Sequence, residues 1–229
     1  MKPFVLDEIP LAIDPVQILQ QFRIPREGER ARMIRDMTAE ACALARPKTL
    51  YTTCLIEGRE QTRLVIGGRD FTSRVLAVNL VHTHRVFPFV STCGVELEEW
   101  SRQFESGLPK FCAEHIKGAA LAAALAAFLQ DLEVRLKPGK VSMMNPGSLE
   151  DWPISEQRPL FDLMGDPASI GVELTERFLM KPAMSASGLW FASEEAYENC
   201  MLCPMADCPL RRAPYDSGLY ERRYLTHTE

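Results

Sequence analysis

Three cysteines stand close together near the end of the chain, at Cys200, Cys203 and Cys208. Two residues separate the first pair, so both sulfurs can point to one side of a tight turn, and four residues separate Cys203 from Cys208. Iron–sulfur clusters are bound by thiolates at such short spacings, often with a proline after a ligand, whereas structural zinc more often uses two separated pairs. The segment predicts an iron–sulfur site. The alternatives are a zinc site and a tail without metal, in which the cysteines are free thiols or partly form a disulfide.

A fourth ligand lies outside this segment, because only three cysteines are clustered. A histidine or an exogenous group would serve, and so would one of four further cysteines, Cys42, Cys54, Cys93 and Cys112. The sequence does not choose among them. Cys93 precedes Gly94 at a predicted strand-to-helix turn, and we take it as the fourth candidate ligand.

Composition limits the class of protein. With 229 residues, 46% of them hydrophobic, the chain can bury a substantial core. A formal net charge of -5 argues against a nucleic-acid partner, which normally meets a basic face. Asp7 and Glu8 interrupt any secretory signal, and the longest apolar stretch, 118–129, is shorter than the ~20 residues of a membrane span. These features, with seven cysteines, predict a cytoplasmic protein that does not enter a membrane.

Hydrophobic periodicity predicts a mixture of helices and strands without a regular β-α-β rhythm. Helices are expected at 15–22, 27–45, 71–81, 111–136 and 155–164, and strands at 50–57, 61–66, 85–92, 141–144, 172–180 and 185–192. Two hairpins are expected, 50–57 with 61–66 and 172–180 with 185–192. This pattern favours an α+β fold with a twisted, largely antiparallel sheet. We divide the chain into an N-terminal helical part (1–48), a main domain (49–192) and a cysteine-bearing tail (193–229).

A specific motif runs from Leu174 to Phe191, with the sequence Leu-Thr-Glu-Arg-Phe-Leu-Met-Lys-Pro-Ala-Met-Ser-Ala-Ser-Gly-Leu-Trp-Phe. It resembles the activation domain of cobalamin-dependent methionine synthase. Upstream, 144–147 (Met-Asn-Pro-Gly) stands where the family has a Pro-Gly turn, and 159–164 is similar to its following helix. The similarity covers about 111–192, and extends more loosely from Thr49 onward.

The resemblance implies a C-shaped domain that docks on a corrinoid-carrying module. It also implies binding of S-adenosylmethionine, so that cob(II)alamin, once reduced, is remethylated. Ser185 and Ser187 share one face of a strand, and Gly188 permits a close approach of backbone to ligand. The candidate cofactor-binding residues are Asn145, Pro146, Gly147, Ser148, Glu176, Ser185, Ser187 and Gly188.

Two positions depart from the family pattern. The family's turn reads Arg-x-x-Pro-Gly-Tyr, and this chain has Met143 and Ser148 in place of the arginine and tyrosine. A family carboxylate on the long helix falls near Ala123 or Ala124. An arginine and a carboxylate are the groups that bind an amino-acid tail. Whether the chain binds S-adenosylmethionine is therefore left open. Glu150 and Asp151 lie near the turn in sequence and are the candidates to replace the family's carboxylate.

The predicted function joins these features. The chain is interpreted as a free-standing relative of the activation domain that serves methionine biosynthesis by reactivating methionine synthase or a related corrinoid methyltransferase, with the cobalamin on the partner. An iron–sulfur centre at the tail cysteines would deliver the electron. Whether the chain itself transfers a methyl group stays open. The alternative is a non-catalytic module that binds a corrinoid protein and holds a structural zinc.

Overall fold

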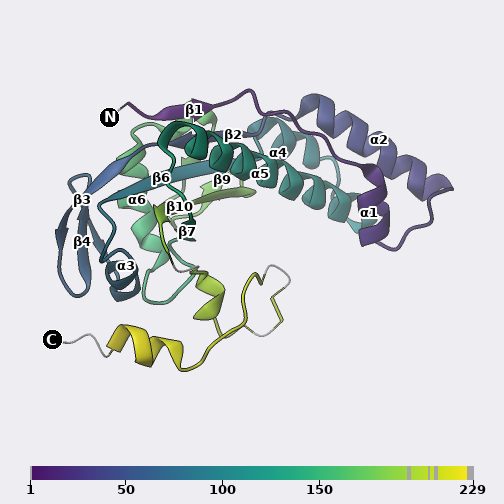
Figure 1. Cartoon of the computed structure of the whole chain (residues 1–229). Coiled ribbons are helices and arrows are strands. Elements are labelled where there is room, and N and C mark those ends of the chain that lie inside the picture. Colours follow the sequence, from purple (N-terminus) through teal and green to yellow (C-terminus); the bar gives the residue numbers. More distant parts are fainter. Residues whose placement is uncertain (1, 195–196, 206, 209–210, 226–229) are drawn as a thin grey trace.

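A computed structural model describes residues 2–194, 197–205, 207–208 and 211–225 (Figure 1). The strands are β1 (Phe4–Leu6), β2 (Lys48–Tyr51), β3 (Cys54–Arg59), β4 (Arg63–Ile66), β5 (Arg69–Thr72), β6 (Arg85–Thr92), β7 (Val141–Met144), β8 (Glu173–Leu174), β9 (Met180–Lys181) and β10 (Ser185–Ala192). The helices are α1 (Pro15–Gln21), α2 (Glu29–Leu44), α3 (Arg74–Asn79), α4 (Val95–Ser101), α5 (Gly107–Leu136) and α6 (Gln157–Met164).

Eight of the described strands form one antiparallel sheet, in the order β1-β2-β6-β3-β4-β5, with β10 paired to both β6 and β7. The central strand β6 is buried along nearly its whole length. Strand β10 runs beside it in a register that sets Gly188 opposite Phe89. The α+β class and the twisted, largely antiparallel sheet predicted from the sequence are confirmed (Figure 1).

The two faces of the sheet are covered by different elements. Helix α5 packs Phe128 and Leu132 against Tyr51, Phe87 and Phe89 on one face. The other face is covered by α3, α6 and the C-terminal residues, in the largest hydrophobic cluster. The third cluster joins α1 and α2 to α4 and the first half of α5. Residues of the N-terminal part therefore share their core with the main domain, and β1 extends its sheet through β2.

Helix α5 is long and apolar enough to span a membrane by length and composition alone. The described structure instead buries Ala120, Ala124, Phe128 and Leu132 of this helix in the protein. Core helices pass the same test of length and composition, so the test is weak evidence for a membrane span.

The helix expected at 71–81 begins later than predicted. Gly67 and Gly68, both at positive φ, form a tight turn that pairs β4 with a further strand, β5. Ser73 then begins α3, because its side-chain oxygen accepts a hydrogen bond from the backbone nitrogen of Leu76. The capping serine, rather than the apolar run, determines where this helix begins.

The prediction of a hairpin between 172–180 and 185–192 is wrong. Strand β8 pairs with β9 in a separate two-stranded ribbon, whereas β10 pairs with β6 and β7 of the main sheet. The apolar strand β10 can bury both of its sides only in the interior of the sheet, which a local hairpin does not offer. Long-range burial therefore overrides the local pattern.

Candidate functional site

The C-terminal segment, which we define as the described residues from Tyr197 to Leu225, is docked on the main domain. Tyr224 is fully buried, and its hydroxyl donates a hydrogen bond of 3.0 Å to the side-chain oxygen of Asn79 on α3. The guanidinium of Arg74 donates to the backbone carbonyl of Tyr224 at 3.3 Å. Met201 and Leu202 pack against the main hydrophobic cluster. The segment that carries the three cysteines is thus held in place by buried contacts.

The side chain of Arg211 lies at the centre of the cysteine loop, which we define as the described residues from Cys200 to Ala213. One guanidinium nitrogen donates to the backbone carbonyls of Cys200 at 3.0 Å and Ala213 at 3.2 Å. The other donates to the carbonyl of Cys203 at 3.1 Å and to that of Met205. A single side chain therefore fixes the backbone of two predicted ligands. Ala206, Pro209 and Leu210 of this motif lie outside the described residues.

The thiol of Cys200 is the most acidic of the perturbed cysteines. The backbone nitrogen of Arg212 donates a hydrogen bond of 3.4 Å to its sulfur, and this bond lowers the pKa of Cys200 below its ordinary value. A thiolate is the form that binds metals. The three cysteines are partly buried and none forms a disulfide. Within the described part of the chain, no three His, Cys, Asp or Glu side chains gather as a metal-binding group. The metal site therefore stays a prediction.

Cys93, the predicted fourth ligand, lies in a different part of the core. It is fully buried in the cluster formed by α1, α2, α4 and α5, whereas the C-terminal segment packs on the cluster beneath α3 and α6. Burial raises the pKa of Cys93 to about 12. A thiol in this environment stays protonated and is a poor metal ligand. The structure does not bring Cys93 to the tail cysteines, so it is not part of the site that we describe.

The predicted turn and the last strand are brought together. Asn145 donates its side-chain amide to the backbone carbonyl of Ser187 at 2.6 Å. A side chain at Gly188 would meet the carbonyl oxygen of Met144 at 2.4 Å. Gly188 therefore permits the close approach of the chain's own 144–147 turn to β10, and not only that of a ligand. Gly147 sits at positive φ, and its nitrogen donates to the carbonyl of Trp152 at 2.7 Å, which closes the turn.

The other candidate residues are engaged in structural contacts or lie apart. The hydroxyl of Ser187 donates to the side chain of Gln157 on α6 at 3.1 Å. Ser185 donates to the carbonyl of Pro182 at 2.8 Å and bonds the Thr92 hydroxyl at 2.9 Å. Pro146 is buried, and Ser148 is exposed after it. Glu176 is exposed in the turn between β8 and β9, away from the Asn145 turn in sequence and sheet.

A cavity of about 410 Å³ opens directly after this turn, between residues 149–151 and the C-terminal segment. Asp151, in its wall, accepts hydrogen bonds from the backbone nitrogen of Val75 at 2.9 Å and from the Ser73 hydroxyl. The opposite wall carries Tyr215 and Tyr220. Sequence reasoning singled out Glu150 and Asp151 but missed the tyrosines, because nothing in the local pattern indicates that the tail folds back over the turn.

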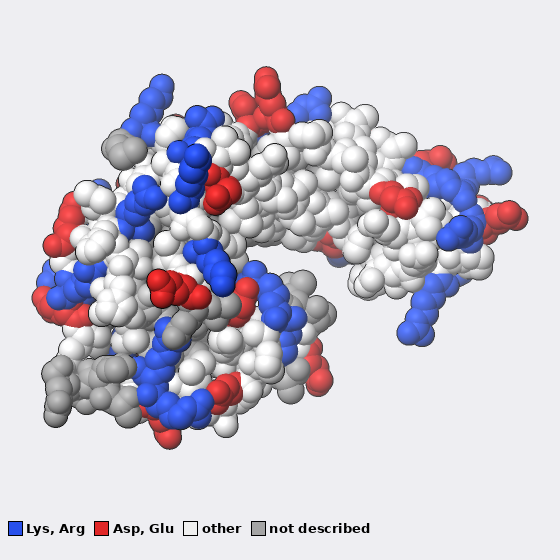
Figure 2. All heavy atoms as spheres, in the orientation of Figure 1, with Lys and Arg blue, Asp and Glu red and all other residues white. Residues whose placement is uncertain are grey.

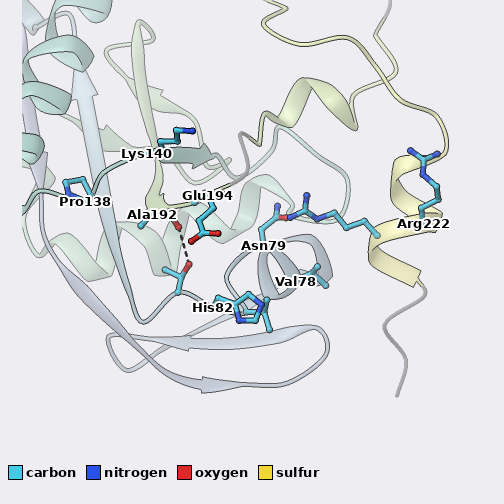
Figure 3. Close-up of a pocket in the computed structure, with 12 residues that line it drawn as sticks. Val78, Asn79, His82, Pro138, Lys140, Ala192, Glu194 and Arg222 are labelled. Atoms are coloured by element: carbon cyan, nitrogen blue, oxygen red, sulfur yellow. Dashed lines mark hydrogen bonds between the residues drawn. The ribbon is translucent and has the colours of Figure 1, made fainter.

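A wider groove of about 1090 Å³ lies at the far end of β7 and β10 (Figure 3). Lys140 and Glu194 come from the segments flanking these strands, and Asn79 and His82 come from α3 and the turn after it. Arg222, from the helical turn near the C-terminus, points away from the other labelled side chains. This groove brings together none of the site residues predicted from the sequence.

The outline of the molecule is a C (Figure 2). The sheet and helices form its upper arc, the C-terminal segment lies below, and a wide notch separates that segment from the α1 and α2 end. Acidic and basic side chains alternate over the visible face, and the upper wall of the notch shows mostly uncharged residues.

Comparisons with known proteins define the class. The family described as "Vitamin B12 dependent methionine synthase, activation domain" matches residues 148–201, which include α6, β10 and the first tail cysteine. No curated protein matches the chain. Among solved structures, a crystal structure of the MetH reactivation domain bound to AdoHcy matches with a TM-score of 0.57 and 17% identity, covering 80% of this chain and 68% of that chain.

These matches confirm the resemblance predicted from the 174–191 motif. The chain has the α+β fold of the MetH reactivation domain. Its residues 148–201 carry the sequence pattern of the methionine synthase activation domain.

Proposed function

We propose that this protein reactivates a cobalamin-dependent methionine synthase or a related corrinoid methyltransferase, as an accessory component in the cytoplasm. The observation that carries the proposal is the family match over 148–201, which includes α6 and β10, in a chain with the fold of the MetH reactivation domain. The C-shaped outline and the mostly uncharged upper wall of its notch support docking of a cobalamin-binding partner (Figure 2). The corrinoid itself belongs to that partner.

The chemistry to be supported has two parts. Cob(II)alamin must gain one electron, and the reduced cobalt must then take a methyl cation from a sulfonium donor, which leaves as a neutral thioether. We propose S-adenosylmethionine as the donor, and the MetH reactivation domain of the matching structure is described as bound to AdoHcy. In this chain Met143 packs beside Trp190 under α5, and Ser148 is exposed. Neither side chain offers the guanidinium or the ring of the family's arginine and tyrosine, so other residues would have to supply those contacts to the donor.

The cysteine loop is the proposed point of electron entry. Its three thiols have spacings typical of iron–sulfur ligands, the Cys200 thiol has a lowered pKa, and Arg211 holds the loop backbone in one shape. An iron–sulfur cluster there would supply electrons at low potential when bound. The chain's own residues would bind it through Cys200, Cys203 and Cys208 and would keep it close to the turn.

The experiment is a reactivation assay under anaerobic conditions. A corrinoid methyltransferase poised as cob(II)alamin is mixed with this protein, a low-potential reductant and S-adenosylmethionine, and its absorbance spectrum is followed. We expect methylcobalamin to appear only when all components are present, and S-adenosylhomocysteine to appear in equal amount. Unchanged cob(II)alamin with several candidate partners would contradict the proposal.

The second candidate function is a non-catalytic module that binds a corrinoid protein and holds structural zinc. It is favoured by the contacts of Asn145, Ser187 and Gly188, because each of these predicted ligand-binding residues contacts another part of the chain. Metal analysis of anaerobically purified protein separates the two functions. Stoichiometric zinc, no iron and no saturable binding of S-adenosylmethionine would select the non-catalytic module.

A further inference from the structure

Cys200 and Cys203 are held close together by a turn of the backbone. The backbone nitrogen of Cys203 donates a hydrogen bond of 3.3 Å to the carbonyl of Cys200, so the two residues form the ends of a four-residue turn. The Cα atoms at the ends of such a turn lie less than about 7 Å apart. A disulfide joins residues whose Cα atoms are about 4.4–6.8 Å apart. The turn therefore places these two cysteines at a separation that a disulfide can span.

The side chain of Arg211 fixes the same two residues a second time. One guanidinium nitrogen donates to the carbonyl of Cys200 at 3.0 Å, and the other donates to the carbonyl of Cys203 at 3.1 Å. The guanidinium is planar and rigid, so its two nitrogens hold these carbonyls at a fixed separation. Both cysteines are partly exposed free thiols. Their backbones are thus ordered before any bond joins the sulfurs, and small molecules can still reach them.

Cys208 is held differently from this pair. Its carbonyl accepts a hydrogen bond of 3.2 Å from the backbone nitrogen of Arg211, and no backbone hydrogen bond between described residues joins it to the Cys200–Cys203 turn. Within the described part of the chain, the three sulfurs also do not gather as a metal-binding group. The loop in this conformation therefore favours a reaction between two sulfurs over one that needs all three.

We propose that Cys200 and Cys203 form a reversible disulfide, and that this disulfide prevents the cysteine loop from binding metal. The second part rests on the proposed function, in which Cys200, Cys203 and Cys208 are the metal ligands. The oxidant is a small-molecule disulfide. One cysteine sulfur attacks it, forms a mixed disulfide and releases the first small thiol. The other cysteine sulfur then attacks the mixed disulfide, forms the Cys200–Cys203 bond and releases the second small thiol.

This exchange balances without a metal or a further reductant. The two protein thiols lose two electrons and two protons, and the small disulfide gains both as it becomes two thiols. An excess of the small thiol reverses the reaction. The oxidised loop retains only the thiol of Cys208, and one thiolate is too few to hold an iron–sulfur cluster or a structural zinc ion. The loop would therefore carry metal only in reducing surroundings, where electrons for the cobalt are also available.

The disulfide is measured on the full chain without metal, equilibrated in buffers with an increasing ratio of glutathione disulfide to glutathione. Free thiols are blocked with N-ethylmaleimide in denaturant, and the protein is cleaved after methionine with cyanogen bromide. Met201 and Met205 separate the three cysteines, so these fall on three fragments, 185–201, 202–205 and 206–229. We expect mass analysis to find the first two fragments linked, and Cys208 alkylated on the third.

Variants test how the pair is held. Arg211→Ala should shift the equilibrium toward the dithiol by about tenfold or more, because the loop backbone must then be ordered when the bond forms. Arg212→Ala is the matched control, since it removes the same charge and leaves the contacts of Arg211 in place. Cys208→Ser should form the disulfide at the same glutathione ratio as the parent. Equal shifts in the two arginine variants would contradict the ordering role of Arg211.

The effect on metal binding is measured with zinc as the probe. Zinc needs no added thiol or sulfide, either of which would reduce the disulfide. The oxidised protein should bind less than about a tenth of the zinc that the reduced protein binds, because two of the three ligands are lost. The double variant Cys200→Ser/Cys203→Ser gives the background from zinc bound elsewhere on the chain.

Three results would overturn the proposal. They are a main product in which Cys208 forms the bond, glutathione attached separately to Cys200 and Cys203 without a bond between them, and equal zinc content in the oxidised and reduced protein. The reactivation assay separates this failure from that of the proposed function. A disulfide that blocks zinc binding, in a protein that remethylates no corrinoid partner, refutes only the proposed function. Remethylation by a protein whose cysteine pair forms no disulfide refutes only the disulfide.

Discussion

The guanidinium of Arg211 donates a hydrogen bond of 3.0 Å to the backbone carbonyl of Cys200, eleven residues earlier in the chain. The same side chain reaches the carbonyls of Cys203, Met205 and Ala213. A planar guanidinium offers five donors in fixed directions, so one side chain can satisfy several carbonyls of a short loop. The cysteines are therefore presented by a loop that is folded around its own arginine.

Replacing Arg211 should loosen this loop without unfolding the domain. In Arg211→Lys the ammonium cannot reach four carbonyls at once, and in Arg211→Ala none is satisfied. We expect the amides of the described residues 199–213 to exchange hydrogen at least about tenfold faster in both variants, with α5 unchanged. The measurement is hydrogen exchange followed by mass spectrometry.

The matched control for this prediction is Arg212→Ala. It removes a surface ion pair of 2.9 Å with Glu198, worth about 0–1 kcal/mol, and leaves the backbone donor to Cys200 in place. Equal exchange in the Arg211 and Arg212 variants would show that the guanidinium does not organise the loop.

The three tail cysteines should act as one metal-binding unit. Cys200→Ser, Cys203→Ser and Cys208→Ser should each lower the bound metal to less than about a fifth of the parent content, since loss of one thiolate exposes the centre. Cys93→Ser should retain the parent content, because Cys93 belongs to the helical core. Metal content and absorbance after anaerobic reconstitution check both statements. Loss of metal from the Cys93 variant would instead indicate that Cys93 is a metal ligand.

The thiol of Cys200 should also react first with an alkylating reagent in the metal-free protein. Its pKa is lowered below the ordinary 9.0 by the hydrogen bond from the Arg212 nitrogen, whereas burial raises the pKa of Cys93 to about 12. Thiolate, not thiol, is the nucleophile, so the rate at Cys200 should reach half its maximum below pH 9.0, and Cys93 should react only after unfolding. Iodoacetamide labelling with peptide mass analysis gives both rates. Faster labelling of Cys93 than of Cys200 would contradict the assigned environments.

The sequence was a sufficient guide wherever local chemistry decides the structure. A helix was expected at 15–22, and Asp14 caps it as α1, with its side chain accepting a hydrogen bond from the nitrogen of Val16 at 2.9 Å. The 174–191 motif predicted the fold through its resemblance to a known family, and its last seven residues, 185–191, lie on β10 in the central sheet. The pairing of β10 with β6, whose partner residues lie 93 to 105 positions earlier in the chain, was not predictable from either local pattern. The same holds for Tyr220, which reaches Asp151 only because the tail folds back across the turn.

Gly188 should be intolerant of any side chain. A methyl group there would lie 2.4 Å from the carbonyl oxygen of Met144 and 2.7 Å from the amide nitrogen of Asn145, both closer than real contacts allow. We expect Gly188→Ala to lower the free energy of unfolding by about 1–3 kcal/mol, through displacement of the turn. Urea denaturation provides the measurement.

The control for Gly188 is another glycine in a regular element. Gly118, inside α5, has no atom within 4 Å of the position that a side chain would take. Gly118→Ala should raise the free energy of unfolding by about 1 kcal/mol, because alanine has the higher helix propensity. Loss of stability in the Gly118 variant, or none in the Gly188 variant, would show that backbone approach is not what selects glycine in β10.

Tyr51 joins the sheet to α5 and makes the stability of the fold depend on pH. Its hydroxyl donates to the carboxylate of Asp131 at 2.5 Å, and Asp131 also accepts from Arg135 at 2.8 Å. Burial, and then Asp131, raise the pKa of Tyr51 above its ordinary 10.0. A group whose pKa is raised by folding stabilises the protein fully below its unfolded pKa, and this contribution is lost as the pH rises above about 10.

Tyr51→Phe keeps the ring against Phe128 and removes only the hydroxyl. At pH 7 we expect the free energy of unfolding to fall by about 1–2 kcal/mol, since Asp131 retains Arg135 as a partner. The difference between parent and variant should then shrink as the pH rises above 10, because the parent must ionise a buried hydroxyl that the variant lacks. Denaturant titrations at pH 7, 9 and 10.5 measure this difference. A gap that stays constant above pH 10 would show that folding leaves the pKa of Tyr51 unchanged, and a gap that widens would show that folding lowers it. Either result would contradict the buried bond between Tyr51 and Asp131.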